Sequence, residues 1–300
     1  MRSDLYIEGV LRKCQVLKHA GLWAAEPKIR PTAWLHNFTA VEKPVAAVLL
    51  DHFVFFSAGA VDRMLTSGYR RLRDELIEKS DKTAALDILN RVVFTGVEGE
   101  DPNVTDSGKL FCRKLRQILG LPEDRFLEPR DVIGVAAQGT PVIFLDDFIG
   151  SGDQFIRTWT RQYQPRFPQS FAEASGADLF KAMSINLVAT EYGLARIKAA
   201  APKLALTESH KVADEYGVRK LPRTPFLPDV QDIPGGIEAL LDKYATMLRV
   251  PNYMSSTQQR KYGHHELGLS LAFEHTTPDA TLPLFWAEVS DKWTPLVRRS

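Results

Sequence analysis

Residues 141–154 read PVIFLDDFIGSGDQ, and this stretch decides how the rest of the chain is interpreted. It begins with an apolar run, which is typical of a strand that is buried on both faces of a parallel sheet. Two adjacent aspartates, Asp146 and Asp147, end that run, and a short loop of glycine and serine follows. Ligands of parallel α/β sheets bind at the carboxyl ends of the strands. The stretch therefore predicts a central strand that ends at a polar ligand site.

Further short strands alternate with helices on both sides of this stretch. RVVFTGV (91–97) reads as a strand, and KLFCRKLRQILGL (109–121) has the apolar spacing of a helix. SINLVATEYGLARIKAAAP (184–202) reads as a strand followed by a helix, and KLALTES (203–209) reads as another strand. This alternation predicts an α/β fold with a mainly parallel sheet and helices on both faces.

The N-terminal third of the chain has helical rather than strand-like spacing. A helix is expected over residues 60–79, which place their apolar side chains on one face. We therefore expect residues 1–90 to form a helical N-terminal elaboration. Residues 91–300 are expected to form the α/β core with a C-terminal extension, and the two parts to pack as one compact unit. Residues 131–147 are expected to hold one strand or a pair of strands.

Composition excludes several classes of protein. The 38 basic and 37 acidic residues give a net charge of +1, so nucleic acid is not indicated globally, although a local patch stays possible. Two cysteines make neither a disulfide framework nor a zinc motif, which favours a reducing compartment. The N-terminus lacks a signal peptide, and no apolar run is long enough to span a bilayer. We expect a cytoplasmic protein that does not bind membranes.

The residues at the end of the central strand suit a phosphorylated sugar. Asp146 and Asp147 can accept hydrogen bonds from a sugar diol or help to hold a hydrated Mg²⁺ ion. A loop that leads into a helix presents backbone N–H groups and the positive end of the helix dipole to an anion. Gly150 and Gly152 permit unusual backbone angles there, and Ser151 adds a hydroxyl donor.

This order of strand, two acids, loop and helix resembles the PRPP-binding motif of type I phosphoribosyltransferases. The resemblance implies that Asp146 and Asp147 contact the ribose hydroxyls, with Mg²⁺, and that the loop holds the 5′-phosphate. The loop residues that it assigns to ligand binding are Gly150, Ser151, Gly152, Asp153 and Gln154. The last two depart from the family pattern. Gln154 replaces a small hydroxyl residue, and Asp153 adds a negative charge beside an anion site.

Three further segments are similar to a narrower group, the phosphoribosyltransferase-like proteins of bacterial conflict and antiphage systems. They are WLHNF with PVAAVLLDHF (34–38 and 44–53), DSGKLFCRKLRQIL (106–119), and HTTPDATLPLFW with KWTPLVRRS (275–286 and 292–300). This resemblance implies an effector of a defence system, and a protein partner from the same operon is expected.

The loop after the first strand, residues 97–109, would correspond to the pyrophosphate-binding loop of the family. Ser107 and Lys109 at the start of the next helix suit an anion, and Arg113 lies one turn further on. The loop also has acidic residues, Glu98, Glu100 and Asp101, which either bind a metal or face water. Capping and solvated charge explain any one of these residues equally well.

Other readings of the motifs fit the sequence less well. A P-loop NTPase needs a second glycine and a Ser or Thr around Gly108–Lys109, and neither is present. The haloacid-dehalogenase and Rossmann patterns also fail. His264 and His265 are adjacent, so an extended segment would point them to opposite sides, and with His275 they fit no zinc helix motif.

Three functions stay open at this point. The first is an enzyme that binds PRPP or a related nucleotide with Mg²⁺ and transfers or cleaves at ribose C1, as a glycosyltransferase acting on pentosyl groups. The second is a non-catalytic module that senses a nucleotide or binds a partner. The third is an effector that acts on a nucleic acid or on a nucleotide pool.

Overall fold

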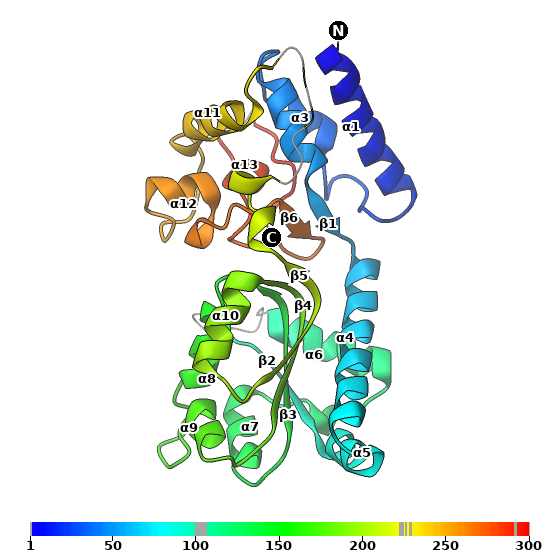
Figure 1. Cartoon of the computed structure of the whole chain (residues 1–300), viewed down its shortest axis with the longest axis vertical. Coiled ribbons are helices and arrows are strands. Elements are labelled where there is room, and N and C mark those ends of the chain that lie inside the picture. The colour runs from blue at the N-terminus through cyan, green and yellow to red at the C-terminus, as the bar shows by residue number, and fades with distance from the viewer. Residues whose placement is uncertain are drawn as a thin grey trace. The chain divides into compact units, whose positions relative to one another are not determined.

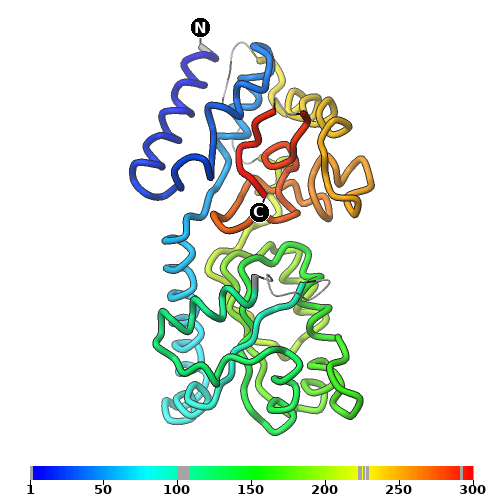
Figure 2. The backbone as a smooth tube through the Cα atoms, turned by 180° about the vertical axis from the view of Figure 1, so that it is seen from behind, coloured from blue at the N-terminus to red at the C-terminus, as the bar shows by residue number. Residues whose placement is uncertain are grey.

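The computed structural model describes residues 2–99, 107–221, 225, 227, 230–290 and 293–299 (Figures 1 and 2). The chain divides into two compact units. Asp62–Ala213 form the first, which we call the sheet unit. The second is made of two separate stretches of the chain, Met1–Val61 and Asp214–Ser300, and we call it the split unit.

The sheet unit is built on four parallel strands. Their order across the sheet is β2 (Val93–Gly96), β3 (Val142–Ile149), β4 (Ala182–Thr190) and β5 (Ala205–Val212). Within residues 141–154, the apolar run and both aspartates lie in β3. Strand β4 is buried along its whole length. Strands that are covered on both faces need continuous apolar runs, which is the pattern that the sequence has.

Helices cover both faces of this sheet, so the predicted α/β fold with a mainly parallel sheet is confirmed. Helices α4 and α6 lie on one side of the strands, and α8, α9 and α10 lie on the other (Figure 1). The helical segments of the unit are α4 (Ala58–Lys79, which enters from the split unit), α5 (Lys82–Arg91), α6 (Ser107–Leu119), η1 (Glu123–Arg125), α7 (Pro129–Ala136), α8 (Asp153–Thr160), α9 (Phe171–Gly176) and α10 (Glu191–Ala200).

One local expectation about this unit is wrong. Residues 131–136 are helical and belong to α7, and β3 begins only at Val142. Short apolar runs do not distinguish a buried strand from a buried helical turn by periodicity alone. Pro129 at the start of α7 marks the helix, because proline suits a first helical turn.

An aromatic cluster holds α8 against the sheet. Phe155 and Trp159 are four residues apart and so share one face of α8. Both pack against Phe144 of β3, with ring centroids 5.6 and 5.9 Å apart. All three side chains are buried. This packing fixes the start of α8, and with it the loop that joins β3 to α8.

The split unit combines helices with a small two-stranded sheet, in which β1 (Val54–Phe56) pairs in parallel with β6 (Leu271–Phe273). None of the helices in the described ranges is long and apolar enough to cross a bilayer. The remaining segments of the unit are α1 (Arg2–His19), α2 (Pro31–Leu35), α3 (Lys43–Asp51), η2 (Asp214–Tyr216), η3 (Val218–Lys220), α11 (Ile233–Ala245), α12 (Thr257–Tyr262), η4 (His264–Glu266) and α13 (Pro283–Trp286).

The two ends of the chain meet in the split unit. The indole N–H of Trp34 donates to the carbonyl oxygen of Leu284 at 3.0 Å, and the Asn37 side chain bonds the backbone of Thr294 in both directions. This arrangement differs from the expected division at residue 90. Residues 62–91 pack with the sheet, whereas the helices before them pack with the C-terminal segment. Such pairing over more than 200 residues leaves no trace in local periodicity.

Candidate functional site

The two aspartates lie inside β3 and are almost fully buried, Asp146 at 3% and Asp147 at 4% exposure. The backbone N–H of Asp147 donates to Oδ1 of Asp146 at 3.0 Å. The expectation that these acids end the strand is corrected, because β3 runs on to Ile149. Ladder pairing with β4 continues through Ile149, opposite Ala189. Side-chain chemistry marks the polar end of a strand but not the last paired residue of its backbone.

The loop after β3 is a tight turn into a helix, as the sequence predicts. Gly152 takes a left-handed backbone conformation with φ of 81° and is the N-cap of α8. A side chain there would be strained, and its Cβ would lie 3.1 Å from the carbonyl oxygen of Gly193. Ser151 is buried, and its Oγ accepts a hydrogen bond from the N–H of Asp153 at 3.3 Å. The turn therefore needs glycine for both conformation and space.

Helix α10 binds the carbonyl groups of this loop. The hydroxyl of Thr190 donates to the Gly150 oxygen at 2.5 Å, and Nη1 of Arg196 donates to the Ser151 oxygen at 2.7 Å. In a trans peptide the C=O and the next N–H point in opposite directions. Since both carbonyls point to α10, the N–H groups of Ser151 and Gly152 point away from it. The loop thus presents two backbone donors beside the N-terminus of α8, a setting that favours an anion.

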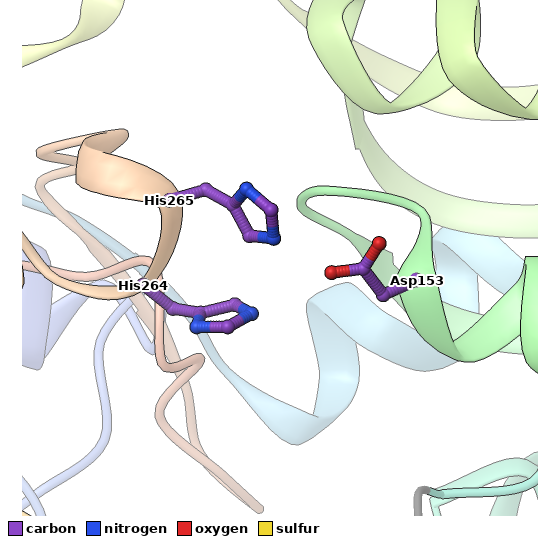
Figure 3. Close-up of side chains that lie close together, drawn as sticks. All are labelled: Asp153, His264 and His265. Atoms are coloured by element: carbon purple, nitrogen blue, oxygen red, sulfur yellow. The ribbon is translucent and has the colours of Figure 1, made fainter. Parts of the chain in front are cut away.

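Asp153 has a counter-ion within the sheet unit. Its carboxylate projects from the first turn of α8 (Figure 3), and Oδ1 lies 2.7 Å from Nη1 of Arg196. A carboxylate in a first helical turn is also stabilised by the helix dipole. Gln154 is exposed one residue further on. The charge that the sequence argument set against anion binding is therefore offset by Arg196.

The loop after β2 begins at the same edge of the sheet, because β2 and β3 are parallel neighbours. Gly96 and Gly108 let the start of α6 touch the end of β2. A Cβ on Gly108 would lie 2.6 Å from the Val97 oxygen, and one on Gly96 would lie 2.5 Å from the Gly108 carbonyl carbon. Two glycines are thus required where backbone meets backbone.

The structure places the predicted pyrophosphate residues at the start of α6. Ser107 is its first residue. Nζ of Lys109 pairs with Glu128 at 3.2 Å, and Arg113 is exposed. The side chain of Ser107 and residues Glu100, Asp101 and Asp106 lie outside what the structure describes. The ligand roles of these residues stay predictions.

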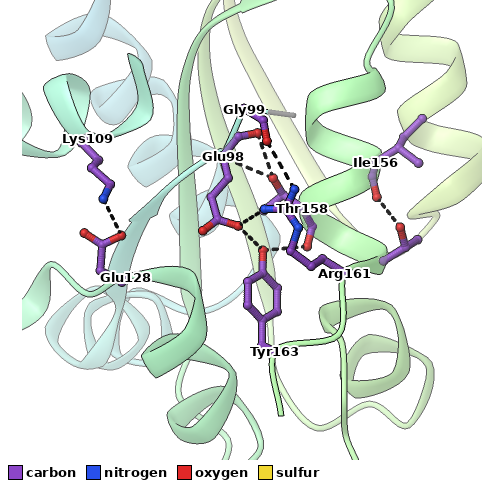
Figure 4. A network of polar contacts seen from close by, with 9 residues as sticks. Glu98, Gly99, Lys109, Glu128, Ile156, Thr158, Arg161 and Tyr163 are labelled. Atoms are coloured by element: carbon purple, nitrogen blue, oxygen red, sulfur yellow. Dashed lines mark hydrogen bonds and ion pairs between the residues drawn. The ribbon is translucent and has the colours of Figure 1, made fainter. Parts of the chain in front are cut away.

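Sequence reasoning missed a polar network that joins the loop after β2 to the end of α8 (Figure 4). The Glu98 carboxylate accepts hydrogen bonds from Arg161 and from the Tyr163 hydroxyl, each at 2.6 Å. The N–H of Glu98 donates to Oγ1 of Thr158 at 3.0 Å. Burial, and next the hydrogen bond to Glu98, raise the pKa of Tyr163 above its usual value. These partners are 60 or more residues from Glu98, so no local pattern predicts them.

A small cavity of about 110 Å³ lies beside the end of β2. Cys112 lines this cavity. Burial, and to a smaller extent Glu128, raise the pKa of its thiol to about 12, so the thiol is protonated at neutral pH. The cavity is lined by Gly96, Val97, Glu98, Lys109, Cys112, Phe126, Leu127, Glu128 and Pro129.

His264 and His265 belong to the split unit and lie in a strained turn. His265 has φ of 52°, and the two imidazole rings lie 4.4 Å apart at 86° to one another (Figure 3). The N–H of His264 donates to the carbonyl oxygen of Asp279 at 2.7 Å. The expectation for an extended segment does not apply here, because the left-handed residue brings neighbouring rings together.

Solved structures that are similar to part of this chain include two proteins of low sequence identity. The AQ2163 protein from Aquifex aeolicus is 13% identical, with a TM-score of 0.25 over 41% of this chain and 55% of its own. Orotate phosphoribosyltransferase from Aeropyrum pernix is 16% identical, with a TM-score of 0.26 over 49% and 72%. This chain thus spans about half the length of the Aquifex protein. No curated protein sequence matches it.

The family comparison covers most of the chain. The model of the PRTase-CE family matches residues 31–299, which include both the β3 motif and the C-terminal segment of the split unit. We conclude that the chain belongs to the PRTase-CE family of phosphoribosyltransferase-like proteins.

Proposed function

We propose that the chain binds PRPP, or a related nucleotide or phosphoribose, at the carboxyl end of β3. The observation that carries this proposal is the way α10 holds the loop. With the Gly150 and Ser151 carbonyls bound, the next two N–H groups point away from α10 beside the start of α8. Backbone donors at a helix N-terminus are suited to a phosphate monoester. The 5′-phosphate of the ligand would take this position.

Asp146 and Asp147 would bind the ribose hydroxyls. Carboxylate oxygens accept hydrogen bonds from a diol, and burial makes each such bond stronger than it is in water. The pair also fits Mg²⁺, which usually takes one or two carboxylates together with substrate phosphates and water. Bound there with a diphosphate, the ion would offset the negative charge of the leaving group.

In the reaction that we propose, the bond between C1 of the ribose and the pyrophosphate oxygen breaks. The electron pair leaves with pyrophosphate, and a nucleophilic atom of the acceptor forms the new bond to C1. The ribose passes through an oxocarbenium-like state, as in glycoside cleavage. The chain would contribute by orienting the ribose and by holding the phosphate in place.

Residues at the start of α6 would face the pyrophosphate. Lys109 pairs with Glu128, but both side chains are substantially exposed, at 37% and 52%. A pair in that setting contributes little to stability, so Lys109 can turn to a phosphate at small cost. Ser107 and Arg113 also lie on α6 and would serve the same task. We also propose a role as a defence effector, which is supported only by the resemblance of segments 34–53, 106–119 and 275–300 to proteins of antiphage systems.

A non-catalytic module that binds a nucleotide or a partner is the second candidate function. Its support is Gln154, which is exposed where related loops have a small hydroxyl residue that bonds the phosphate. A site with fewer phosphate contacts can still bind a ligand without orienting it for transfer.

Calorimetric titration with PRPP and MgCl₂, paired with an assay of pyrophosphate release, tests the proposal. Asp147→Asn keeps the shape of the side chain and removes its charge, and it is expected to weaken PRPP binding by about tenfold or more. Asp87→Asn is the control, because it alters an exposed carboxylate of the same unit. Binding without pyrophosphate release would favour the non-catalytic candidate. Wild-type protein that binds no PRPP would contradict the proposal.

A further inference from the structure

Asp153 poses a problem for any phosphate at the β3 loop. It directly follows the turn of Gly150, Ser151 and Gly152, and its own N–H bonds Ser151. Its side chain is only 22% exposed, so solvent screens its charge incompletely. A bare carboxylate at this place would repel a phosphate and counteract the backbone donors.

The guanidinium group of Arg196 contacts both the Asp153 carboxylate and the backbone of the loop. Nη1 lies 2.7 Å from the Asp153 carboxylate and also donates to the Ser151 carbonyl at 2.7 Å. The guanidinium carbon sits 5.6 Å from the centre of the Tyr192 ring, which supports it through a cation–π contact. The same group therefore cancels the charge and fixes the direction of the loop.

Two other residues at the start of α10, Thr190 and Gly193, also hold the β3 loop. Thr190 holds the Gly150 carbonyl and accepts from the N–H of Gly193 at 2.9 Å, so it caps α10 and anchors the loop together. Gly193 allows the close approach, because a Cβ there would lie 2.3 Å from the Gly150 oxygen. Thr190, Gly193 and Arg196 recur at every third residue and line one face of the first turns of the helix.

We infer that Arg196 is a positioning residue of the phosphate site, acting as the counter-ion of Asp153 and as the anchor of the Ser151 carbonyl. This inference rests on the proposed function, and it names the device that makes a loop with an aspartate compatible with phosphate. Arg196 works through the loop and does not touch the ligand. Asp153 and Arg196 form one functional pair.

The pair predicts an unusual rescue. Arg196→Gln removes the guanidinium that pairs with Asp153 and anchors Ser151, and affinity for ribose 5-phosphate is expected to fall by about tenfold. Asp153→Asn alone is expected to change affinity little, because Arg196 already offsets that charge. In the double variant the repelling charge is gone, so affinity is expected to rise at least about threefold above that of Arg196→Gln, and the loss that remains relative to wild type measures the missing Ser151 anchor.

Titration calorimetry with ribose 5-phosphate measures all four proteins. Lys198→Gln is the matched control, since it removes one positive charge from an exposed position on the same helix. An Arg196→Gln variant that binds like wild type would overturn the inference. A double variant as weak as Arg196→Gln would overturn the counter-ion role, because loss of the Ser151 anchor alone predicts no rescue.

Failure of the proposed function gives a different result. Wild-type protein that binds neither ribose 5-phosphate nor PRPP would reject the phosphate site, and the inference would be rejected with it. Normal binding by wild type together with either unfavourable variant result would reject the role of Arg196 alone. Thermal unfolding of every variant shows whether a lost affinity reflects a lost fold.

Discussion

Two loops leave the carboxyl edge of the same sheet, and they are held in different ways. The loop after β3 is held through its backbone, because Thr190 and Arg196 bind two successive carbonyls. The start of the loop after β2 is held from the end of α8, through the Glu98 carboxylate, which Arg161 and Tyr163 bind, and through backbone groups of Glu98 and Gly99.

The difference concerns what each kind of contact fixes. Binding a carbonyl sets the plane of a peptide, so it also sets the direction of the next N–H. In the β2 loop, Thr158 and Arg161 bond backbone groups of Glu98 and Gly99, so they fix the peptide planes where the loop leaves the sheet. The β3 loop is thus suited to a ligand group of fixed geometry.

The largest effect is expected where the β3 loop meets α10. Gly193→Ala puts a Cβ 2.3 Å from the Gly150 oxygen, and backbone on both sides must shift to relieve it. Overpacking of this kind typically costs about 1–3 kcal/mol, and we expect the upper part of that range. Unfolding in urea measures the change in free energy.

Gly134→Ala is the control for that substitution. Gly134 lies in α7 with nothing within 4 Å of its Cβ position, so alanine is expected to stabilise the helix by about 0.5–1 kcal/mol. Equal free energies of unfolding for the two variants would contradict the close contact between Gly193 of α10 and the Gly150 oxygen of the β3 loop.

A smaller effect is expected at the carboxylate that holds the β2 loop. The pKa of Tyr163 is raised above its usual value of 10 by burial and by Glu98. The folded protein keeps the phenol proton at pH values where the unfolded chain loses it, so the free energy of unfolding falls as pH rises above 10. Tyr163→Phe removes this dependence.

The measurement is denaturant unfolding between pH 9 and 11. The wild-type curve is expected to fall more steeply than that of Tyr163→Phe, by at most about 1 kcal/mol per pH unit after screening. The other tyrosines are common to both proteins and cancel in the difference. Parallel curves would contradict the contact with Glu98.

The smallest effect on stability is expected from Lys109→Gln. Its exposed pair with Glu128 contributes about 0.5 kcal/mol or less. Affinity for PRPP is nevertheless expected to fall about fivefold, since one charged hydrogen bond to the pyrophosphate is lost. Ribose 5-phosphate lacks that group and serves as the control ligand in calorimetry. An equal loss of affinity for both ligands would contradict a contact between Lys109 and the pyrophosphate.

Much of the sheet unit could be predicted from the sequence. Apolar runs indicate β2, β3 and β4, because buried parallel strands leave a continuous local signal, whereas β5 is a partly exposed edge strand with only a short run. The turn at Gly150–Gly152 and the start of the next helix at Asp153 could also be predicted, because glycine and serine before a helix are a local sequence signal.

The partners of that loop could not be predicted. Arg196 lies 43 positions after Asp153, on a helix whose exposed face shows ordinary charged residues. Thr190 reads simply as a strand end or a helix cap. Such contacts depend on which strands are neighbours in the sheet, and one sequence does not state that order.

The division of the chain also escaped local reasoning. Trp34 and Phe38 have helical spacing, but their ring neighbours include Phe285 and Trp293 from the far end of the chain. A helical pattern shows that an apolar face needs a partner and does not show which one.

The split unit has a consequence for synthesis on the ribosome. Its first stretch, Met1–Val61, emerges early, but the residues that bury Trp34 and Phe38 follow only after the whole sheet unit. At ordinary rates of translation the delay is on the order of 10 s. The sheet unit, being continuous in the chain, can fold during that interval. The nascent N-terminal helices therefore leave their apolar faces uncovered until the last segment of the chain has been synthesised.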